Sequence, residues 1–225
     1  MKVLGLDTSS GACSVALFDT EPDRVLASER VLIQRGHAEI LFVQIARVTK
    51  AAGVGLSVID RFAVTTGPGT FTGVRIGLSA ARGLALAASR PLIGINSLET
   101  VAFGAAYEPE SIVVTAFDAR RDELYVQAFR AGAPLSAPFV ASVRAAAEAV
   151  MLSAPADASF AVIGSGAAQL VEAITAGGAR TVMAHGDPLP DAALLARLAA
   201  TRVPSSHPPR PLYLRAPDAR IATAL

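Results

Sequence analysis

The chain has 225 residues, 20 basic and 19 acidic side chains, a net charge of +1 and one cysteine. This length allows one large or two small domains, each with its own core. Because the charge is nearly balanced and aromatic residues make up only 5%, the composition does not support a nucleic-acid surface formed by this chain alone. A single cysteine excludes internal disulfides and zinc clusters, and the alternating run around Cys13 predicts a core position for it.

The mean hydropathy of +0.46 is high, but alanine supplies most of it. Arg82, Arg90 and Arg121 interrupt the longest apolar stretches before the roughly 18 residues that a membrane span requires. The first residues carry Asp7 where a signal peptide needs an apolar segment. We therefore expect a cytoplasmic protein without a membrane segment.

The first half of the chain alternates strand and helix patterns. Two apolar runs, 3–7 and 14–18, flank a polar turn and predict a hairpin with Asp7 at the end of its first strand. Apolar residues at helical spacing predict a helix over 38–52. The pattern then predicts a strand over 62–66, a glycine-rich turn, a helix over 76–89, a strand over 91–95 and a helix over 98–106.

The second half repeats this plan. The runs 113–118 and 125–129 predict a second hairpin, in which Asp118 corresponds to Asp7, and 161–176 repeats the order strand, Gly-x-Gly turn, helix. Further along the chain we expect a surface excursion over 134–138, a short helix over 191–201 and a linker or wrapped tail over the proline-rich stretch 203–211. The sequence therefore predicts a duplicated α/β unit with two lobes, residues 1–103 and residues 104–225.

The block Gly67-Pro68-Gly69-Thr70-Phe71-Thr72-Gly73-Val74-Arg75 lies between a predicted strand and a predicted helix. Its glycines are one residue too far apart for a dinucleotide-binding G-x-G-x-x-G turn, and it lacks the lysine of a P-loop. A glycine backbone beside a helix N-terminus favours a nearby anion. The same turn is also common in α/β proteins without a ligand, so the block alone leaves both interpretations open.

Asp7 and Asp118 at matching strand ends, with Gly-rich strand–helix junctions in both halves, resemble the duplicated, ribonuclease H-like fold of the actin, hexokinase and Hsp70 superfamily. This resemblance implies two lobes whose Asp hairpins face each other across a cleft that holds a nucleotide phosphate and its magnesium ion. The weak candidates for cofactor contacts are Asp7, Thr8, Ser9, Gly67 and Gly69.

Within that superfamily, the segments 6–9, 67–77, 83–85 and 213–215 resemble the TsaB family over nearly the whole chain. This family is the scaffold partner in bacterial threonylcarbamoyl-adenosine modification of tRNA. The resemblance implies a TsaD-like catalytic homologue and a TsaE-like ATPase as partners. It also implies a homodimer when the chain is alone, and contact with tRNA only through the complex.

The catalytic TsaD family carries a Gly-Val-Asn-His-x-x-x-His segment that holds a metal. The similar segment here, 94–101, has Ser97 and Val101 at the two histidine positions, and neither side chain replaces an imidazole as a ligand. The chain's histidines are His37, His185 and His207, in unrelated contexts. We expect a surface or capping role for His37, no metal site and no catalytic residue, since no other catalytic pattern is present.

The nucleotide-binding parts also differ from those of the superfamily. The second hairpin turn, 118–123, is bulky and charged, and the segment 164–166 lacks the longer glycine–asparagine block that the catalytic relative uses for adenine. We therefore expect no ATP site in the isolated chain, while ATP or ADP at the partner interface stays open. Asp7 and Asp118 are expected to persist as turn formers.

Two alternatives of other classes are a small-molecule kinase and a metallopeptidase of the same superfamily. A kinase requires a working phosphate cleft, and a peptidase requires a metal or a nucleophile. For the scaffold interpretation, we expect a partner interface on the helices 38–52 and 72–89. Its residues would be Leu41, Ile45, Gly73, Gly77, Ala80 and Leu84. Packing of the small-residue strip against the chain's own sheet is an equally weighted alternative.

Overall fold

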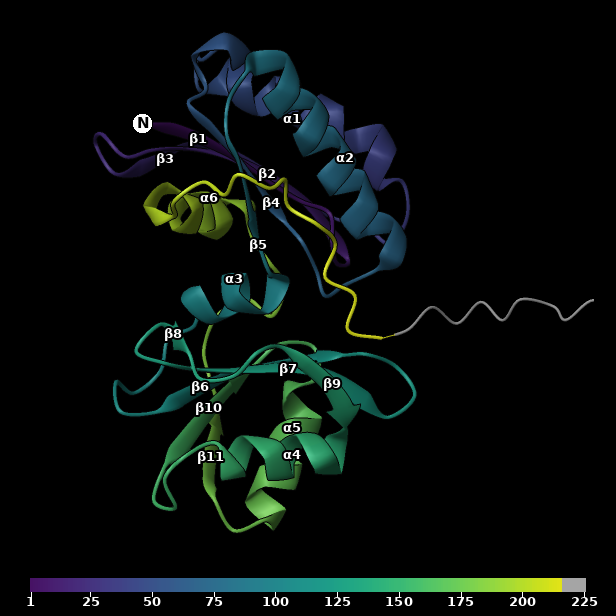
Figure 1. Ribbon diagram of the computed structural model, residues 1–225, viewed down its shortest axis with the longest axis vertical. Coiled ribbons are helices and arrows are strands. Elements are labelled where there is room, and N and C mark those ends of the chain that lie inside the picture. The colour runs from purple at the N-terminus through teal and green to yellow at the C-terminus, as the bar shows by residue number, and fades with distance from the viewer. Residues whose placement is uncertain (216–225) are drawn as a thin grey trace, which may run out of the picture.

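The computed structural model describes residues 1–215, which form two lobes, each built on one sheet (Figure 1). The first sheet has the strand order β3-β2-β1-β4-β5. Its strands are β1 (Lys2–Asp7), β2 (Ala12–Asp19), β3 (Arg24–Leu32), β4 (Arg61–Thr65) and β5 (Leu92–Ile95). The second sheet contains β6 (Ile112–Asp118), β7 (Glu123–Arg130), β8 (Ala133–Pro134), β9 (Phe139–Ser142), β10 (Ser159–Ile163) and β11 (Arg180–Met183).

The two sheets share one topology. In the first, β1 pairs antiparallel with β2 and β2 with β3, while β1–β4 and β4–β5 are parallel. In the second, β6–β7 and β7–β9 are antiparallel, while β6–β10 and β10–β11 are parallel. The short β8 adds a further antiparallel pairing to β7. This identity of order and direction confirms the predicted duplicated α/β fold of the actin-like type.

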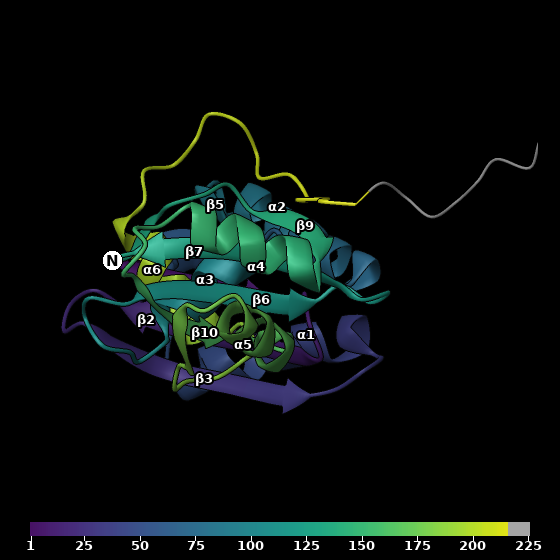
Figure 2. The same cartoon turned by 90° about the horizontal axis from the view of Figure 1, so that it is seen from below.

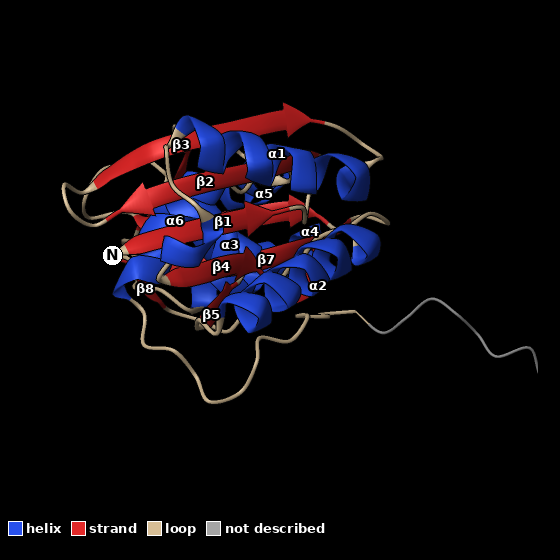
Figure 3. Cartoon of the chain, turned by 90° about the horizontal axis from the view of Figure 1, so that it is seen from above, coloured by secondary structure: helices blue, strands red, loops and turns tan. Residues whose placement is uncertain are grey.

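Each sheet has a pair of helices on its outer face. In the view of Figure 3, α1 (His37–Ala51) and α2 (Phe71–Ala88) lie over the first sheet. On the other lobe, α4 (Val143–Leu152) and α5 (Ala167–Ala176) lie over the second sheet (Figure 2). Large apolar side chains of the strands and helices form a separate core in each lobe. Burial of this apolar area stabilises each lobe in its own right.

The remaining helices are exchanged between the lobes. The helix α3 (Ser97–Phe103) follows the first sheet in sequence but packs on β6 and β7, where Leu98 and Val101 join the core of the second sheet. The helix α6 (Ala192–Thr201) belongs to the second half but packs on β1, β2 and β4, with Leu195 in the core of the first sheet. Each of these helices therefore packs on the sheet of the opposite half of the chain.

The predicted elements of both halves are present, with ends within a few residues of the expected ones. The largest difference is at the start of α2, which begins at Phe71 rather than near residue 76. Four elements, β3, β9, α4 and β11, were not predicted, and neither was a short 3-10 helix, Leu56–Val58. Cys13 is fully buried, as predicted. Over the described residues, no helix has the length and apolarity to cross a membrane.

The glycine block brings α2 against the first hairpin turn. The Thr70 side chain caps α2 by accepting a hydrogen bond from the Gly73 backbone N–H, and the Thr70 N–H donates to the Ser9 carbonyl at 2.8 Å. The Thr8 hydroxyl donates to the Gly73 carbonyl at 2.7 Å. A Cβ atom at Gly69 or Gly73 would overlap the carbonyl oxygen of Ser9 or Thr8. These glycines are therefore required by backbone contact inside the lobe.

The residues predicted for a partner interface lie mostly inside their own lobe. Gly73, Gly77 and Ala80 are buried and face the chain's own hairpin and sheet, and Leu41 and Ile45 are core residues of the same lobe. Leu84 is partly buried and also packs on this core. The strip of small side chains does permit a close approach, but the approaching group is the Thr8 backbone. The alternative, packing against the own sheet, is the one observed.

The proline-rich stretch forms a wrapped tail without helix or strand. It leaves α6, crosses the first lobe, and lies along one side of the molecule (Figure 1). Arg82 of α2 donates a hydrogen bond to the Pro209 carbonyl. A Cβ at Gly94 of the edge strand β5 would lie 2.5 Å from Cβ of Pro209. The Leu212 N–H donates to the Thr66 carbonyl at 2.8 Å, so the tail is fixed to the lobe that contains β4 and β5.

A Gly73→Ala substitution tests the contact between α2 and the hairpin turn. We expect it to lower the free energy of unfolding by at least about 2 kcal/mol, because the new methyl group must displace the Thr8 carbonyl. The matched control is Gly83→Ala in the same helix, where no atom lies within 4 Å of the new Cβ; it should stabilise by about 0.5–1 kcal/mol. Equal urea-unfolding curves for both variants would contradict this account.

Candidate functional site

A cleft of about 730 Å³ lies between the lobes, where the two hairpin turns face each other. The first lobe contributes its hairpin turn, the glycine loop and the end of β3, and the second lobe contributes the end of β6 with the following turn. The lining residues are Ser9, Ser10, Gly11, Leu32, Ile33, Gln34, Pro68, Gly69, Thr70, Phe117, Asp118, Ala119, Arg120, Tyr125, Ser165, Leu189 and Pro190. A volume of this size suits a small molecule.

Asp7 lies behind the cleft, fully buried at the end of β1. Its Oδ1 atom accepts hydrogen bonds from the Ser9 N–H (3.1 Å), the Ser9 hydroxyl (2.6 Å) and the Thr65 hydroxyl (2.5 Å). Its Oδ2 atom has no partner among the described residues. Burial raises the pKa of Asp7, while the hydrogen bonds and the charge of Arg30 oppose that rise. One oxygen of the carboxyl group therefore holds the hairpin turn and β4 together, and the other oxygen is buried without a donor among the described residues.

The predicted cofactor residues divide between the surface and the interior. Ser9 and Gly69 line the cleft, whereas Asp7, Thr8 and Gly67 are not part of its lining. Gly67 has a φ of +98°, which favours glycine, and the Leu212 carbonyl of the tail lies next to it. The structure thus brings the predicted residues together around one turn, with two of them in contact with the cleft.

The second hairpin turn differs from the first in exposure. Asp118 Oδ1 accepts a hydrogen bond from the Arg120 N–H at 2.7 Å, two residues ahead, which matches the bond from the Ser9 N–H to Asp7. Both aspartates are therefore turn formers, as predicted. The Ser165 hydroxyl accepts from the Asp118 N–H at 3.0 Å. Unlike Asp7, Asp118 is exposed at the cleft wall, beside the guanidinium of Arg120.

Ser97 and Val101, at the positions where the resemblance places metal-binding histidines, serve other purposes. Ser97 begins α3, is fully buried and donates its hydroxyl to the Ser9 hydroxyl at 3.1 Å. Val101 is 1% exposed and packs with Leu98 against the second sheet. A chain of hydroxyl hydrogen bonds therefore runs from α3 through Ser9 to Asp7.

The three histidines lie in separate parts of the structure and do not form a metal-binding cluster with one another. His37 begins α1, as predicted, but it is buried rather than on the surface, and its Nε2 lies 3.0 Å from the Ser10 carbonyl. His185 makes a backbone bridge with Ala106, and His207 lies in the exposed tail. Within residues 1–215, no group of three or more His, Cys, Asp or Glu side chains is placed to hold a metal ion.

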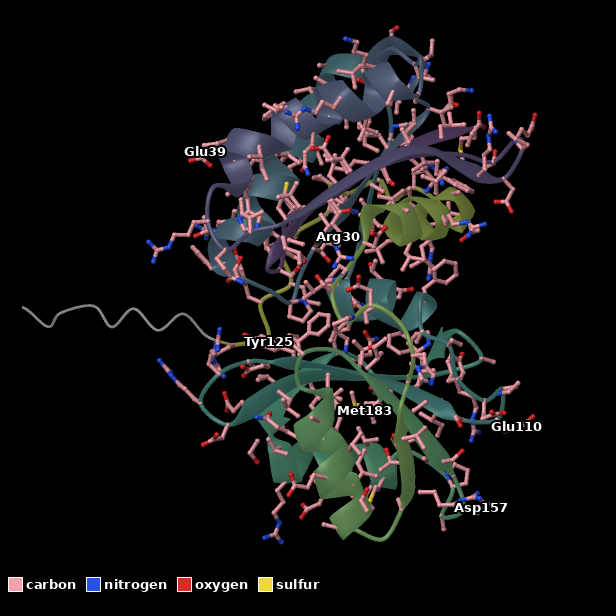
Figure 4. The ribbon with its side chains drawn as sticks, turned by 180° about the vertical axis from the view of Figure 1, so that it is seen from behind. Arg30, Glu39, Glu110, Tyr125, Asp157 and Met183 are labelled. Atoms are coloured by element: carbon pink, nitrogen blue, oxygen red, sulfur yellow. The ribbon has the colours of Figure 1, made fainter. Side chains whose placement is uncertain are left out.

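Sequence reasoning missed the aromatic side of the cleft. Phe117 and Tyr125 lie opposite each other on the paired strands β6 and β7, and both line the cleft. Figure 4 shows Tyr125 on the edge of the second lobe that faces the first, with Arg30 of β3 across from it. The sequence feature that could have indicated this aromatic side is the position of Phe117 directly before Asp118, at the end of the predicted strand. Arg30 forms an ion pair with Asp187, and the hydrogen bond from Arg30 lowers the pKa of Asp187.

The groups that line the cleft can form hydrogen bonds and stack on a flat ligand. Its lining offers serine and threonine hydroxyls, two aromatic rings, one carboxylate and one guanidinium, and no histidine, cysteine or lysine among the described residues. A nucleophilic or general-base mechanism needs an activated group next to its partner. Asp7, the carboxyl group nearest to the first hairpin turn, accepts its three hydrogen bonds at Oδ1.

An Asp7→Asn variant tests the buried carboxyl by the pH dependence of stability. The pKa of Asp7 is raised in the folded protein, so the unfolded chain ionises first as pH increases above about 4, and wild-type stability falls. Asn keeps an oxygen for the three donors and does not ionise. Relative to wild type, the free energy of unfolding of the variant should therefore rise between pH 4 and pH 7.

Asp19→Asn is the control, because the pKa of Asp19 is shifted in the opposite direction to that of Asp7. The side chain of Lys2 lowers the pKa of Asp19 to about 2, so its contribution is present above about pH 4 and is lost as pH falls toward 2. This variant should lose stability at neutral pH relative to wild type. Urea unfolding at several pH values measures both differences, and an Asp7→Asn curve parallel to wild type would refute the assignment.

Comparison with known proteins gives a consistent picture. A model of the TsaD family, described as tRNA N6-adenosine threonylcarbamoyltransferase, matches residues 30–223. The tRNA threonylcarbamoyladenosine biosynthesis protein TsaB of Escherichia coli is 39% identical over 126 residues, 56% of this chain and 53% of that protein. The TsaB protein of Haemophilus influenzae is 41% identical over 127 residues, 56% of this chain and 52% of that protein. The matched segment thus spans about half the length of these curated relatives.

A solved structure resembles the chain over nearly its full length. It is an uncharacterized Pseudomonas aeruginosa protein with similarity to peptidase YeaZ, 31% identical, with a TM-score of 0.77 and coverage of 95% of this chain and 99% of that one. The two-lobe fold, the extent of the family match and the TsaB relatives agree with one another. The chain therefore belongs to the family that the TsaD model describes, and within it to the TsaB branch.

Proposed function

We propose that this chain is the non-catalytic, activating subunit of a cytoplasmic complex that transfers a threonylcarbamoyl group to the adenosine next to the anticodon of tRNA. A TsaD-like homologue would supply the catalytic site, and a TsaE-like ATPase would complete the complex. Membership of the TsaB branch supports this role. The observation that carries it is the use of Ser97 and Val101 for internal contacts.

The geometry around α3 gives the physical reason why Ser97 and Val101 support a scaffold role and not a metal site. Two ligands one helical turn apart can share a metal only if both side chains offer free lone pairs on the same helix face. The Ser97 hydroxyl is hydrogen-bonded to Ser9, and the Val101 side chain is apolar and packed in the core. These residues hold the lobes together, which supports a scaffold. A kinase or a metallopeptidase has no supporting observation among the described residues.

The exposed face of α1 is our proposed docking surface, in place of the buried strip. Phe42 is 56% and Val43 46% exposed, and they border a shallow hollow with Ala46, Arg47 and Lys50. Exposed large apolar side chains rimmed by basic residues are typical of protein interfaces. We propose that this face binds the TsaD-like homologue, and that it pairs two copies of the chain when the homologue is absent.

Nucleotide and RNA would then contact the complex rather than the isolated subunit. We propose that the chain alone binds no nucleotide tightly and that ATP or ADP, where present, lies at the junction with the partner. The near-balanced charge supports contact with tRNA only through the complex.

Depletion of the protein tests the proposed pathway. We expect the threonylcarbamoyl mark on tRNA to be lost, because the catalytic homologue would lack its activator. Mass spectrometry of tRNA nucleosides measures the mark, and re-expression of the wild-type chain is the control. Full retention of the mark after depletion would overturn the proposal.

A Phe42→Glu variant tests the docking surface. A buried, unpaired carboxylate costs several kcal/mol, so affinity for the TsaD-like homologue should fall by about a hundredfold or more. The matched control is Leu152→Glu, since Leu152 is 87% exposed and lies on the other lobe. Titration calorimetry with the purified homologue distinguishes the two. If both variants bind as wild type does, the interface lies elsewhere.

A further inference from the structure

We propose that residues 212–215 are a strap that joins the two lobes beside the interlobe cleft and limits how far the cleft opens. The proposal does not depend on the proposed function. The strap follows the wrapped tail and has one anchor on each lobe, Tyr213 on the first and Arg215 on the second.

The first anchor is an aromatic contact at the start of α2. The ring of Tyr213 stacks on that of Phe71, with 5.4 Å between ring centroids and 25° between ring planes. The Nε–H of Arg75 donates to the Tyr213 hydroxyl at 2.8 Å, and its guanidinium lies 3.7 Å from the Phe71 ring centroid. Together with the backbone bond from Leu212 to Thr66, these contacts fix the strap to the first lobe beside the glycine loop.

The second anchor is the guanidinium of Arg215, which reaches the turn between β6 and β7. Its Nη1 donates to the Ala119 carbonyl at 2.9 Å, and its Nη2 pairs with the carboxylate of Glu123. A fork of this kind suits the planar guanidinium, which presents several donors in fixed directions. The two anchors are two residues apart in sequence, yet they hold different lobes.

The turn that Arg215 grips is strained. Arg120, Arg121 and Asp122 have φ values of 65°, 57° and 58°, so three consecutive non-glycine residues adopt the left-handed conformation. This conformation is unfavourable for residues with a Cβ and persists only where surrounding contacts hold it. Arg215 bonds both ends of the turn, at Ala119 and Glu123, and therefore opposes its relaxation.

The position of the strap couples this turn to the cleft. Pro68, Gly69 and Thr70 line the cleft on the side of the first anchor, and Ala119 and Arg120 line it on the side of the second. Loss of either anchor frees the second turn to move away from the glycine loop. Because the ion pair is partly exposed, its contribution is modest, and a partner that competes for Arg215 or Tyr213 can release the strap.

The test measures the distance between the lobes in the full-length chain. Spin labels are attached at Leu86→Cys on α2 and Leu152→Cys on α4, which are 82% and 87% exposed. Native Cys13 is fully buried, and burial raises its pKa to about 12, so it stays unlabelled. The test variants are Tyr213→Ala and Arg215→Gln, and the matched control is Arg210→Gln, an exposed arginine of the same tail.

We expect one narrow interlobe distance in wild type and in Arg210→Gln, and a longer, broader distribution in both test variants. The Ala119 and Glu123 amides, which are hydrogen-bonded within the turn, should exchange with solvent about tenfold faster in both. Circular dichroism establishes that each variant is folded. An unchanged distance in either test variant overturns the strap, even where amide exchange alone increases.

Discussion

The exchange of α3 and α6 between the lobes is the constraint on which the rest of the structure depends. Each helix buries its apolar face on the sheet of the other half, and the two helices also contact each other. If the lobes moved far apart, the sheet faces that α3 and α6 cover would become exposed to solvent. The hairpin turns at the ends of β1 and β6 remain facing each other across one cleft, at a separation that this joint helps to set.

The same joint explains the chemistry of the first hairpin turn. Because α3 begins beside the glycine loop, the Ser97 N–H donates to the Gly67 carbonyl at 2.8 Å and its hydroxyl reaches Ser9. Ser9 in turn donates to Asp7. Neutral hydroxyls thus connect the joint to a carboxyl group whose pKa burial raises. A close-packed network of this kind favours a fixed turn over a group that changes partners during a reaction.

The sequence predicted the repeated hairpins well because both consist of short apolar runs around a polar turn, and the first strand of each ends at an Asp that bonds its own backbone. It also predicted that Gly73 and Gly77 permit a close approach. It could not identify the approaching group, since periodicity defines a helix face but not what covers it. The edge strand β3 was missed because residues 24–32 alternate weakly and stay partly exposed. The pairing of Phe117 with Tyr125 depends on strand register, which the turn alone does not fix.

The tail adds a second connection between the lobes that is independent of the exchanged helices. Pro209 packs on the face of β5 at Gly94, where no side chain occupies the space. From there the tail continues past Thr66 and the glycine loop, which brings Arg215 to the opposite turn. The contact with β5 and the contact with the second lobe are therefore consequences of a single path. The width of the cleft depends on how the chain's own tail is bound, so a partner that binds the tail would act on the cleft without entering it.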